Sequence, residues 1–469
     1  MISTYMTNKF YQIEITVLVA ISLVARFFLL NWHGLNYDEL ITFDVIHYNS
    51  LKEVLIWIRD HDTQLPAYYA LIYFVKWIFG SSVFILRLTS LIFDLLAHWQ
   101  LFLLLREFGD KRRTWVGVVL FSYMFLVLRY SVEVRPYALL TFLSTITIRY
   151  IYLFSKGKKV TVTNLLTYIF SAIFLGLTHY YGLLLLILQI FYVAYLSFQK
   201  DRRLFKIIMI ISAVTGFILY PLMSDILTDL IVKHQFRPEL KFYDFLGYVS
   251  YFFSGTFTLL LLIISLLGLK IMANPRKAFI NQSLLLFIGL PVIVLLVALL
   301  KNILISPSLE PRYMVVVLPS VMVLISHLTD WNSKRGQFLF YLLLACMIGN
   351  VTFKEQFFKR VYQLDSEGAA NRILELKRVH PKSSILNCNI CLRAYLQKTN
   401  LKCWNDDRKE QVSDIWEDSF FQAQLILAQR MDSCQLSDTL KDKYELKNSQ
   451  IFKGISVQLW EQRSISSGI

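Results

Sequence analysis

Long apolar runs separated by short polar segments dominate the first three quarters of the chain. Runs near the ~20 residues that a helix needs to cross a bilayer recur along this region. A β-barrel would show short alternating segments instead, so the pattern predicts a polytopic α-helical membrane protein. We expect eleven membrane helices, over 11–31, 83–105, 114–130, 136–155, 163–178, 181–198, 205–222, 247–270, 282–300, 313–329 and 337–352.

The segments between these runs alternate in charge. One set is short and basic, and comprises 106–113, 156–159, 200–206, 276–277 and 334–335. The other set is longer, or mixes charged and aromatic residues, and comprises 32–82, 131–135, 179–180, 223–246 and 301–312. Basic loops face the cytoplasm. We therefore expect an integral protein of the plasma or inner membrane, with its N-terminus inside and its C-terminal region outside.

The first outer segment, 32–82, is too long for a plain loop. Within it, 51–58 and 68–79 are short, amphipathic and rich in apolar residues. Aromatic side chains in them suit the depth of the membrane interface. We expect both to be helices that lie along the interface.

The composition becomes that of a soluble protein after about residue 353. We predict a helix over 366–379 and strands over 384–389, 425–428 and 455–460, with helices between the strands. The expected division is a transmembrane catalytic domain over 1–352 and a small extracytoplasmic α/β domain over 353–469.

Four of the five cysteines, Cys388, Cys391, Cys403 and Cys434, fall in this outer domain. An even number in an oxidising compartment favours two disulfides. The alternatives are a zinc site, for which the spacing of Cys388 and Cys391 is suitable, and free thiols. Cys346 lies in the last apolar run, where a cysteine packs as a small hydrophobe.

Composition narrows the class further. The chain is 56% hydrophobic and only 17% charged, with a mean hydropathy of +0.50. The net charge of +15 comes from basic residues that cluster in the short loops, so we expect no nucleic-acid partner. Neither a P-loop nor a dinucleotide-binding fingerprint is present.

The outer segments carry the residues suited to chemistry. Asp38 and Glu39 follow the first helix, where they would be a solvated loop, a helix cap or a catalytic pair. Asp62, beside His61, would cap a turn closed by Pro66 or position a polar ligand. Transporters hold polar groups near mid-helix, whereas here they collect at one end, which favours an enzyme at the interface.

The outer hairpin over 129–137 carries Glu133 and Arg135. These two would pair with each other, or Arg135 would bind phosphate while Glu133 orients it or a sugar hydroxyl. His179 lies in a second outer turn. Arg312 either snorkels to the interface or binds phosphate from the same face.

Several of these outer segments resemble the motifs of a known protein family. Residues 130–140, YSVEVRPYALL, are close to the pattern Y-S-Q-E-A-R-P-Y-A-L-L. Residues 62–69, DTQLPAYY, resemble D-x-H-P-P-L-Y-Y, with Gln64 and Leu65 in place of His-Pro. RLTS over 87–90 resembles R-L-P-S, and the acidic pair, HYY over 179–181 and PRY over 311–313 have similar positions.

Residues 1–330 thus resemble the GT-C superfamily of polyprenyl-phosphate-sugar-dependent glycosyltransferases. The nearest type is the protein O-mannosyltransferase and lipid A aminoarabinose transferase group, glycosyltransferase family 39 and relatives. The C-terminal domain matches no motif of that group.

The resemblance implies an inverting hexosyl- or pentosyltransferase in the cell envelope. It takes a sugar from a polyprenyl-phosphate donor to a hydroxyl of a protein, lipid or envelope glycan. Asp38 would be the general base and Arg135 and Arg312, with Lys301, the phosphate ligands. Glu39, Glu133 and His179 would shape the sugar pocket. Further substrate contacts would be Asp62, Tyr137, Tyr180 and Tyr313.

Many relatives need no metal, so none is expected, and Asp38 and Glu133 would be the ligands of a divalent cation if one binds. Two other functions stay open: a transporter or flippase of polyprenyl-linked glycans, and a noncatalytic assembly subunit. The sugar and the acceptor are not identified by the sequence.

Overall fold

The computed structural model describes most of the helical region and part of the C-terminal region. The described residues are 2–61, 65–108, 110–156, 161–200, 216, 242–254, 282–304, 309–328, 331, 333–359, 366–381, 384–387, 404–405, 424–430, 444–452 and 455–462. The predicted helix over 205–222, most of that over 247–270, Asp62 and the four outer cysteines lie outside these residues.

Contacts divide the chain into two compact units. The first comprises residues 1–30 and 49–356, and the second comprises 31–48 and 357–469. The segment 31–48, which contains the acidic pair, therefore belongs with the C-terminal region, although two helices of the first unit flank it in the sequence.

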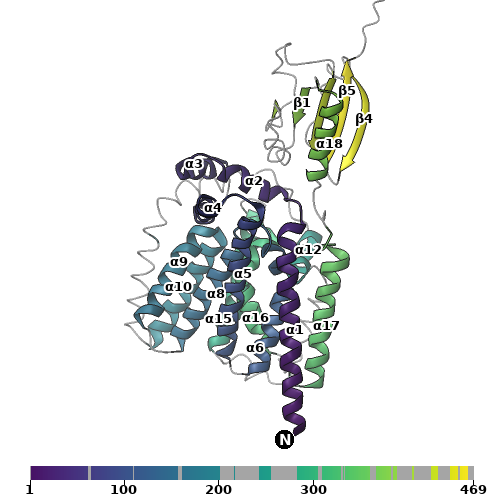
Figure 1. Ribbon diagram of the computed structural model, residues 1–469. Coiled ribbons are helices and arrows are strands. Elements are labelled where there is room, and N and C mark those ends of the chain that lie inside the picture. The colour runs from purple at the N-terminus through teal and green to yellow at the C-terminus, as the bar shows by residue number, and fades with distance from the viewer. Residues whose placement is uncertain are drawn as a thin grey trace, which may run out of the picture. The chain divides into compact units, whose positions relative to one another are not determined.

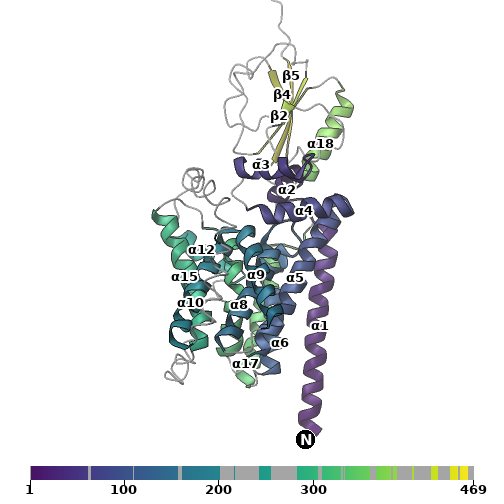
Figure 2. The ribbon, with the colours of Figure 1, turned by 90° about the vertical axis from the view of Figure 1, so that its left-hand side faces the viewer.

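The first unit is a bundle of helices that run side by side (Figures 1 and 2). Its long core helix α8 is mostly buried, whereas α1 exposes most of its surface. The elements are α1 (Ile2–Trp32, whose last two residues belong to the second unit), α3 (Leu51–His61), α4 (Pro66–Phe79), α5 (Val83–Arg106), α6 (Lys111–Tyr123), α7 (Phe125–Tyr130), α8 (Tyr137–Ser155), α9 (Val162–Thr178), α10 (Tyr180–Lys200), α12 (Phe242–Phe252), α15 (Gln282–Leu304), the 3₁₀ helix η1 (Pro311–Val317), α16 (Leu318–Leu328), α17 (Lys334–Gly349) and the π-helix η2 (Asn350–Lys354).

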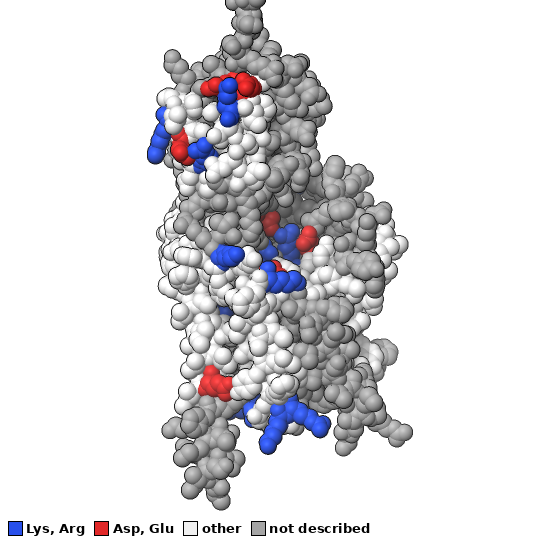
Figure 3. Space-filling view, turned by 90° about the vertical axis from the view of Figure 1, so that its right-hand side faces the viewer, with Lys and Arg blue, Asp and Glu red and all other residues white. Residues whose placement is uncertain are grey.

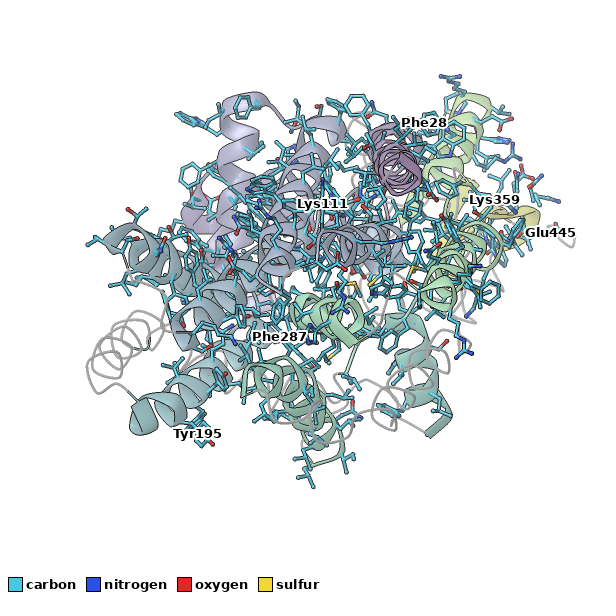
Figure 4. The ribbon with its side chains drawn as sticks, turned by 90° about the horizontal axis from the view of Figure 1, so that it is seen from below. Phe28, Lys111, Tyr195, Phe287, Lys359 and Glu445 are labelled. Carbon is cyan, nitrogen blue, oxygen red and sulfur yellow. The ribbon has the colours of Figure 1, made fainter. Side chains whose placement is uncertain are left out.

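Apolar side chains fill the bundle and also cover its rim. Phe287 is fully buried and packs against Phe108 and Tyr152, with ring centroids 5.3 and 5.5 Å apart. Tyr195, by contrast, is 54% exposed at the rim (Figure 4). Among the described residues, five helices are long and apolar enough to cross a membrane. An apolar surface on such helices is suited to lipid, and the chain is an integral membrane protein.

The two ends of the bundle differ in charge. Lysine and arginine side chains gather at the lower end in Figure 3, where α6 and α17 begin. Lys111, Lys334 and Arg335 are exposed there. The two basic segments that the structure describes, at the starts of α6 and α17, therefore lie at the same end of the bundle.

Two predicted helices are not continuous α-helices. The run predicted over 114–130 is broken at Met124, which is extended (φ −64°, ψ 130°), into α6 and α7. The run predicted over 313–329 begins as the 3₁₀ helix η1. The predicted interfacial helices are present as α3 and α4.

The second unit contains α2 (Tyr37–Ile46), α18 (Ser366–Val379) and a five-stranded sheet. The strands are β1 (Ser384–Asn387), β2 (Trp404–Asn405), β3 (Gln424–Arg430), β4 (Tyr444–Phe452) and β5 (Ile455–Gln462), in the order β2-β1-β3-β5-β4. The first two pairings are parallel, whereas β5 is antiparallel to both β3 and β4. Ala369, Ala370 and Ile373 form the buried face of α18. The fold class predicted from the sequence is confirmed.

The expectation of only helices between the predicted strands was wrong at the two-residue strand β2 and at β4. β4 lies at the edge of the sheet and exposes residues 445–451, so its sequence lacks the apolar alternation of a strand with a buried face. A register shift between Leu446 and Asn448 further interrupts the alternation.

A buried ion pair ties three elements together near the break in the bundle. Arg26 of α1 is fully buried and donates through Nε to Asp94 of α5 at 2.9 Å. Its Nη2 donates to the Ser122 carbonyl at 2.8 Å, at the end of α6, where helix carbonyls lack intrahelical partners. His98 adds a contact of 2.9 Å from Nε2 to the Ser122 hydroxyl. The pair thus binds α1 and α5 to the broken end of α6.

Loss of the Arg26 cation should strongly destabilise the bundle, because it leaves a buried carboxylate alone. We expect Arg26→Met to lower the free energy of unfolding in detergent by ~3–5 kcal/mol. The double variant Arg26→Met/Asp94→Leu should recover much of that loss. Arg59→Met is the matched control, because the Arg59–Asp60 pair is exposed and worth ~0–1 kcal/mol. A loss no larger than that of the control would contradict this role.

Candidate active site

The short hairpin between α7 and α8 is fixed by hydrogen bonds to its own backbone and to α5. The Glu133 carbonyl accepts from the Ser90 hydroxyl at 2.7 Å and from the Arg135 N–H at 2.8 Å. Pro136 then caps α8. Glu133 and Arg135 are both buried. The hairpin backbone is therefore held in place, and it fixes the positions of the two charged side chains.

Glu133 has a partner that sequence reasoning missed. Arg129, one helical turn earlier, donates through Nε to the Glu133 carboxylate at 2.8 Å. Arg129 Nη1 donates to the Tyr251 hydroxyl of α12 at 2.9 Å. The spacing of four residues between Arg129 and Glu133, which suits an ion pair on a helix, could have revealed this contact in the sequence. The contact with Tyr251 could be found only from the structure.

The segment RLTS that carried part of the resemblance has a structural role. Arg87 is buried and donates through Nη1 to the Leu30 carbonyl at 3.1 Å, near the end of α1. Ser90 holds the hairpin, as described. This turn of α5 thus joins the outer end of α1 to the hairpin.

Aromatic rings from three elements surround His179. The His179 ring centroid lies 4.8 Å from that of Tyr313, 5.7 Å from Tyr181 and 6.0 Å from Tyr137. Tyr180 lies 6.2 Å away. The predicted residues Tyr137, His179, Tyr180 and Tyr313 are therefore brought together from α8, the α9–α10 turn and η1.

Two guanidinium groups act on this cluster. The Arg312 Cζ lies 6.0 Å from the Tyr137 centroid and 5.6 Å from the Tyr313 centroid, and such contacts are favourable cation–π geometry. Its Nε is 4.0 Å from a Glu310 carboxylate oxygen. Arg135, from the hairpin, is near enough to affect the charge of His179.

His179 is held as a neutral ring. Burial, then the guanidinium of Arg312, then that of Arg135, lower its pKa to about 3. Its Nδ1 accepts from the Tyr181 N–H at 3.2 Å, so Nδ1 carries no proton. The neutral tautomer therefore has its proton on Nε2 and can donate one hydrogen bond there.

The 3₁₀ form of η1 separates two faces. A 3₁₀ helix has three residues per turn, so Pro311, Met314 and Val317 lie on one face. These three line an apolar pocket of about 160 Å³, together with residues of α12, α15 and α16. Arg312 and Tyr313 follow Pro311 directly and belong to the other faces, toward His179. An α-helix would not keep these three positions aligned.

The acidic pair begins α2 in the second unit. The Glu39 N–H donates to the Asn36 side chain at 2.9 Å, and the Glu39 carboxylate accepts from the Asn36 N–H at 3.2 Å. Glu39 is fully buried, whereas Asp38 is partly exposed. The helix-cap alternative thus describes Glu39, and Asp38 is the more accessible acid.

The remaining predicted residues are placed as follows. Lys301 lies in the last turn of α15 and is partly exposed. Asp62 is not among the described residues. Within the part of the chain that the structure describes, no group of three His, Cys, Asp or Glu side chains could hold a metal ion.

The fold can be compared with solved structures. No protein-family model matches the sequence, and no curated protein matches it significantly. ArnT from Cupriavidus metallidurans in the apo state has a TM-score of 0.59 at 12% identity, over 96% of this chain and 98% of that chain. The same protein bound to undecaprenyl phosphate has a TM-score of 0.59 at 12% identity, over 95% and 97% of the two chains.

This chain has a fold like that of ArnT. The likeness extends over 96% of this chain and 98% of the ArnT chain, so it covers the C-terminal region as well as the bundle. At 12% identity this likeness shows the fold alone.

The bundle should keep the His179 ring neutral throughout the physiological pH range. Because its pKa is about 3, its ring should not titrate between pH 5 and 8. Acidification from about 6.5 toward 3 should destabilise the protein, because the unfolded state binds the proton there. NMR of histidine-labelled protein checks this, with His179→Asn assigning the signal. A His179 transition near pH 6.5 would contradict it.

Proposed function

We propose that the chain is an inverting glycosyltransferase that uses a polyprenyl-phosphate-linked sugar. The observation that carries the proposal is that Arg135 and Arg312 both lie close enough to His179 to lower its pKa, while Pro311, next to Arg312 in the chain, lines an apolar pocket. Two cations and a neutral donor suit a phosphate. The apolar pocket beside them suits the first part of a hydrocarbon chain, so the pair of subsites matches a lipid phosphate.

The volume of the pocket limits the size of the group that it can bind. A cavity of about 150 Å³ accommodates a molecule the size of benzene, and this pocket measures about 160 Å³. One five-carbon isoprene unit is of that size. The pocket thus receives the unit next to the phosphate, and the rest of the chain lies along the apolar rim of the bundle, in the lipid.

Asp38 is proposed as the general base. The acceptor oxygen attacks the anomeric carbon, the bond from that carbon to the phosphate oxygen breaks, and polyprenyl phosphate leaves with the electron pair. The acceptor proton passes to the Asp38 carboxylate. Arg135 and Arg312 stabilise the charge that grows on the phosphate. One displacement of this kind inverts the anomeric carbon.

Glu39 and Glu133 remain the proposed walls of the sugar pocket, whereas His179, first assigned to that pocket, is now proposed to donate to the phosphate. Tyr137, Tyr180 and Tyr313 remain proposed as further substrate contacts. Lys301 and Asp62 stay proposals on the grounds of the sequence alone. Both ends of the segment 31–48 join the first unit covalently, at Leu30 and Asn49.

The proposed orientation places the substrate site outside the cytoplasm. The chain runs through α6 and α7 before it reaches the hairpin, so we infer that the hairpin lies at the end of the bundle opposite the basic start of α6. Basic loops face the cytoplasm, so the site and the C-terminal domain face out. The acceptor is then a hydroxyl of an envelope molecule.

Loss of the Asp38 carboxylate should abolish transfer without loss of donor binding. Removal of a general base costs roughly 10²–10⁴-fold in kcat, so Asp38→Asn should show that loss while its Kd for undecaprenyl phosphate is unchanged. Asp44→Asn, on the same helix, is the matched control. Purified protein in lipid nanodiscs is assayed with an undecaprenyl-phosphate sugar and an envelope extract.

Transfer by Asp38→Asn at the native rate would refute Asp38 as the base. If the native protein transfers nothing to any acceptor yet moves the lipid-linked sugar across the bilayer, the transporter alternative replaces the enzyme.

Two further variants should separate the phosphate subsite from the chain subsite. Arg312→Met should weaken the binding of both methyl phosphate and geranyl phosphate, because both carry the anion. Leu295→Trp, which fills the pocket, should weaken only geranyl phosphate. Leu296→Trp is the matched control, because Leu296 is 52% exposed and does not line the pocket. Thermophoretic titration measures each Kd. Equal effects of Leu295→Trp on both ligands would exclude the pocket as a chain subsite.

A further inference from the structure

The segment that carries the acidic pair is attached to the C-terminal region by specific contacts. The Trp32 indole Nε1–H donates to the Phe358 carbonyl at 2.8 Å. The His33 Nε2 lies 2.5 Å from the Phe357 carbonyl oxygen, which makes it the donor of a second hydrogen bond. These two bonds join the end of α1 to the residues that follow η2, more than 300 positions later in the chain.

An aromatic contact reinforces the two bonds. The rings of His33 and Phe357 meet edge to face, with centroids 4.7 Å apart and an interplanar angle of 70°. Phe357 is fully buried and His33 is 7% exposed. Edge-to-face packing of buried rings has a preferred geometry, so the contact fixes direction as well as distance.

The residues between this contact and Asp38 have little conformational freedom. Leu35 and Asn36 are buried, and the reciprocal bonds between Asn36 and Glu39 set the first turn of α2. Asp38 lies within that first turn. The orientation of its carboxylate is therefore determined by where residues 32 and 33 are held.

We propose that Trp32, His33, Phe357 and Phe358 form a clasp through which the start of the C-terminal region positions Asp38. The residues of the clasp are positioning residues, since none of them needs to touch a substrate. The inference rests on the proposed role of Asp38 as base. It assigns the placement of the base to residues 357–358 of the second unit, whereas the lipid-phosphate subsites belong to the first.

Hydrogen exchange tests the clasp without any assay of transfer. Trp32→Phe removes one hydrogen bond and keeps an aromatic ring, so we expect the amides of α2 to exchange about 2–10-fold faster. Phe357→Ala empties a buried site and should accelerate them by about tenfold or more. Amides of α8 should be unchanged in both variants. The matched controls are Trp77→Phe and Phe353→Ala, at positions 76% and 80% exposed.

Transfer kinetics test what the clasp does. In an otherwise native chain, Trp32→Phe should lower kcat about 2–10-fold with the Kd for undecaprenyl phosphate unchanged. In an Asp38→Asn background the same substitution should change the residual rate by less than twofold. A merely structural role would instead lower the folded fraction equally in both backgrounds.

The outcomes separate the two proposals. Unchanged exchange of α2 in Trp32→Phe and Phe357→Ala overturns the clasp, whatever the kinetics. Faster exchange with unaltered kcat also overturns its positioning role. Faster exchange in a protein that shows no transfer, with or without Asp38, keeps the physical clasp and refutes the proposed function.

Discussion

An apolar bundle that contains a broken helix has to supply hydrogen-bond partners for the backbone groups that the break exposes. Arg26 meets that requirement here, because one guanidinium serves both the Asp94 carboxylate and the Ser122 carbonyl. The break at Met124 then redirects the chain, so that α7 ends in the hairpin that holds Glu133 and Arg135. The polar contact at the break and the hairpin are thus joined by one short helix, α7.

The candidate site combines charged, aromatic and apolar side chains, and the backbone holds them at fixed spacing. Arg129 donates to the Glu133 carboxylate, which limits the negative charge near the proposed phosphate subsite. Arg312 and His179 share the Tyr313 ring as a common wall. The 3₁₀ turns of η1 keep the polar and apolar sides of this wall apart. Each of these arrangements depends on the backbone as much as on the side chains.

The sequence predicted most of the helices and the grouping of charged residues at one end, because apolar length and loop charge are direct signals of membrane topology. It also predicted α18 to its terminal residues and the strands β1, β3 and β5. The edge strand β4 was missed, since an exposed strand has no apolar face. The break at Met124 and the 3₁₀ form of η1 were missed because apolar periodicity does not reveal a local change of helix type.

Among site residues, motif spacing was enough to nominate Arg135, His179 and Arg312. It did not predict that Glu133 would pair with Arg129, because Arg135 is nearer to Glu133 in the sequence and was the expected partner in an ion pair. The association of 31–48 with the C-terminal region joins residues more than 300 positions apart. No local pattern carries such information.

Because η1 is a 3₁₀ helix, its length in residues fixes distances between the groups along it. A 3₁₀ helix rises about 2.0 Å per residue, against 1.5 Å in an α-helix. The distance between the proposed phosphate ligand Arg312 and the pocket is therefore set by the number of residues in η1. One inserted or deleted residue would rotate the polar side of η1 onto its apolar side. The proposed lipid-phosphate subsite thus requires a fixed chain length at this point as well as the arginine.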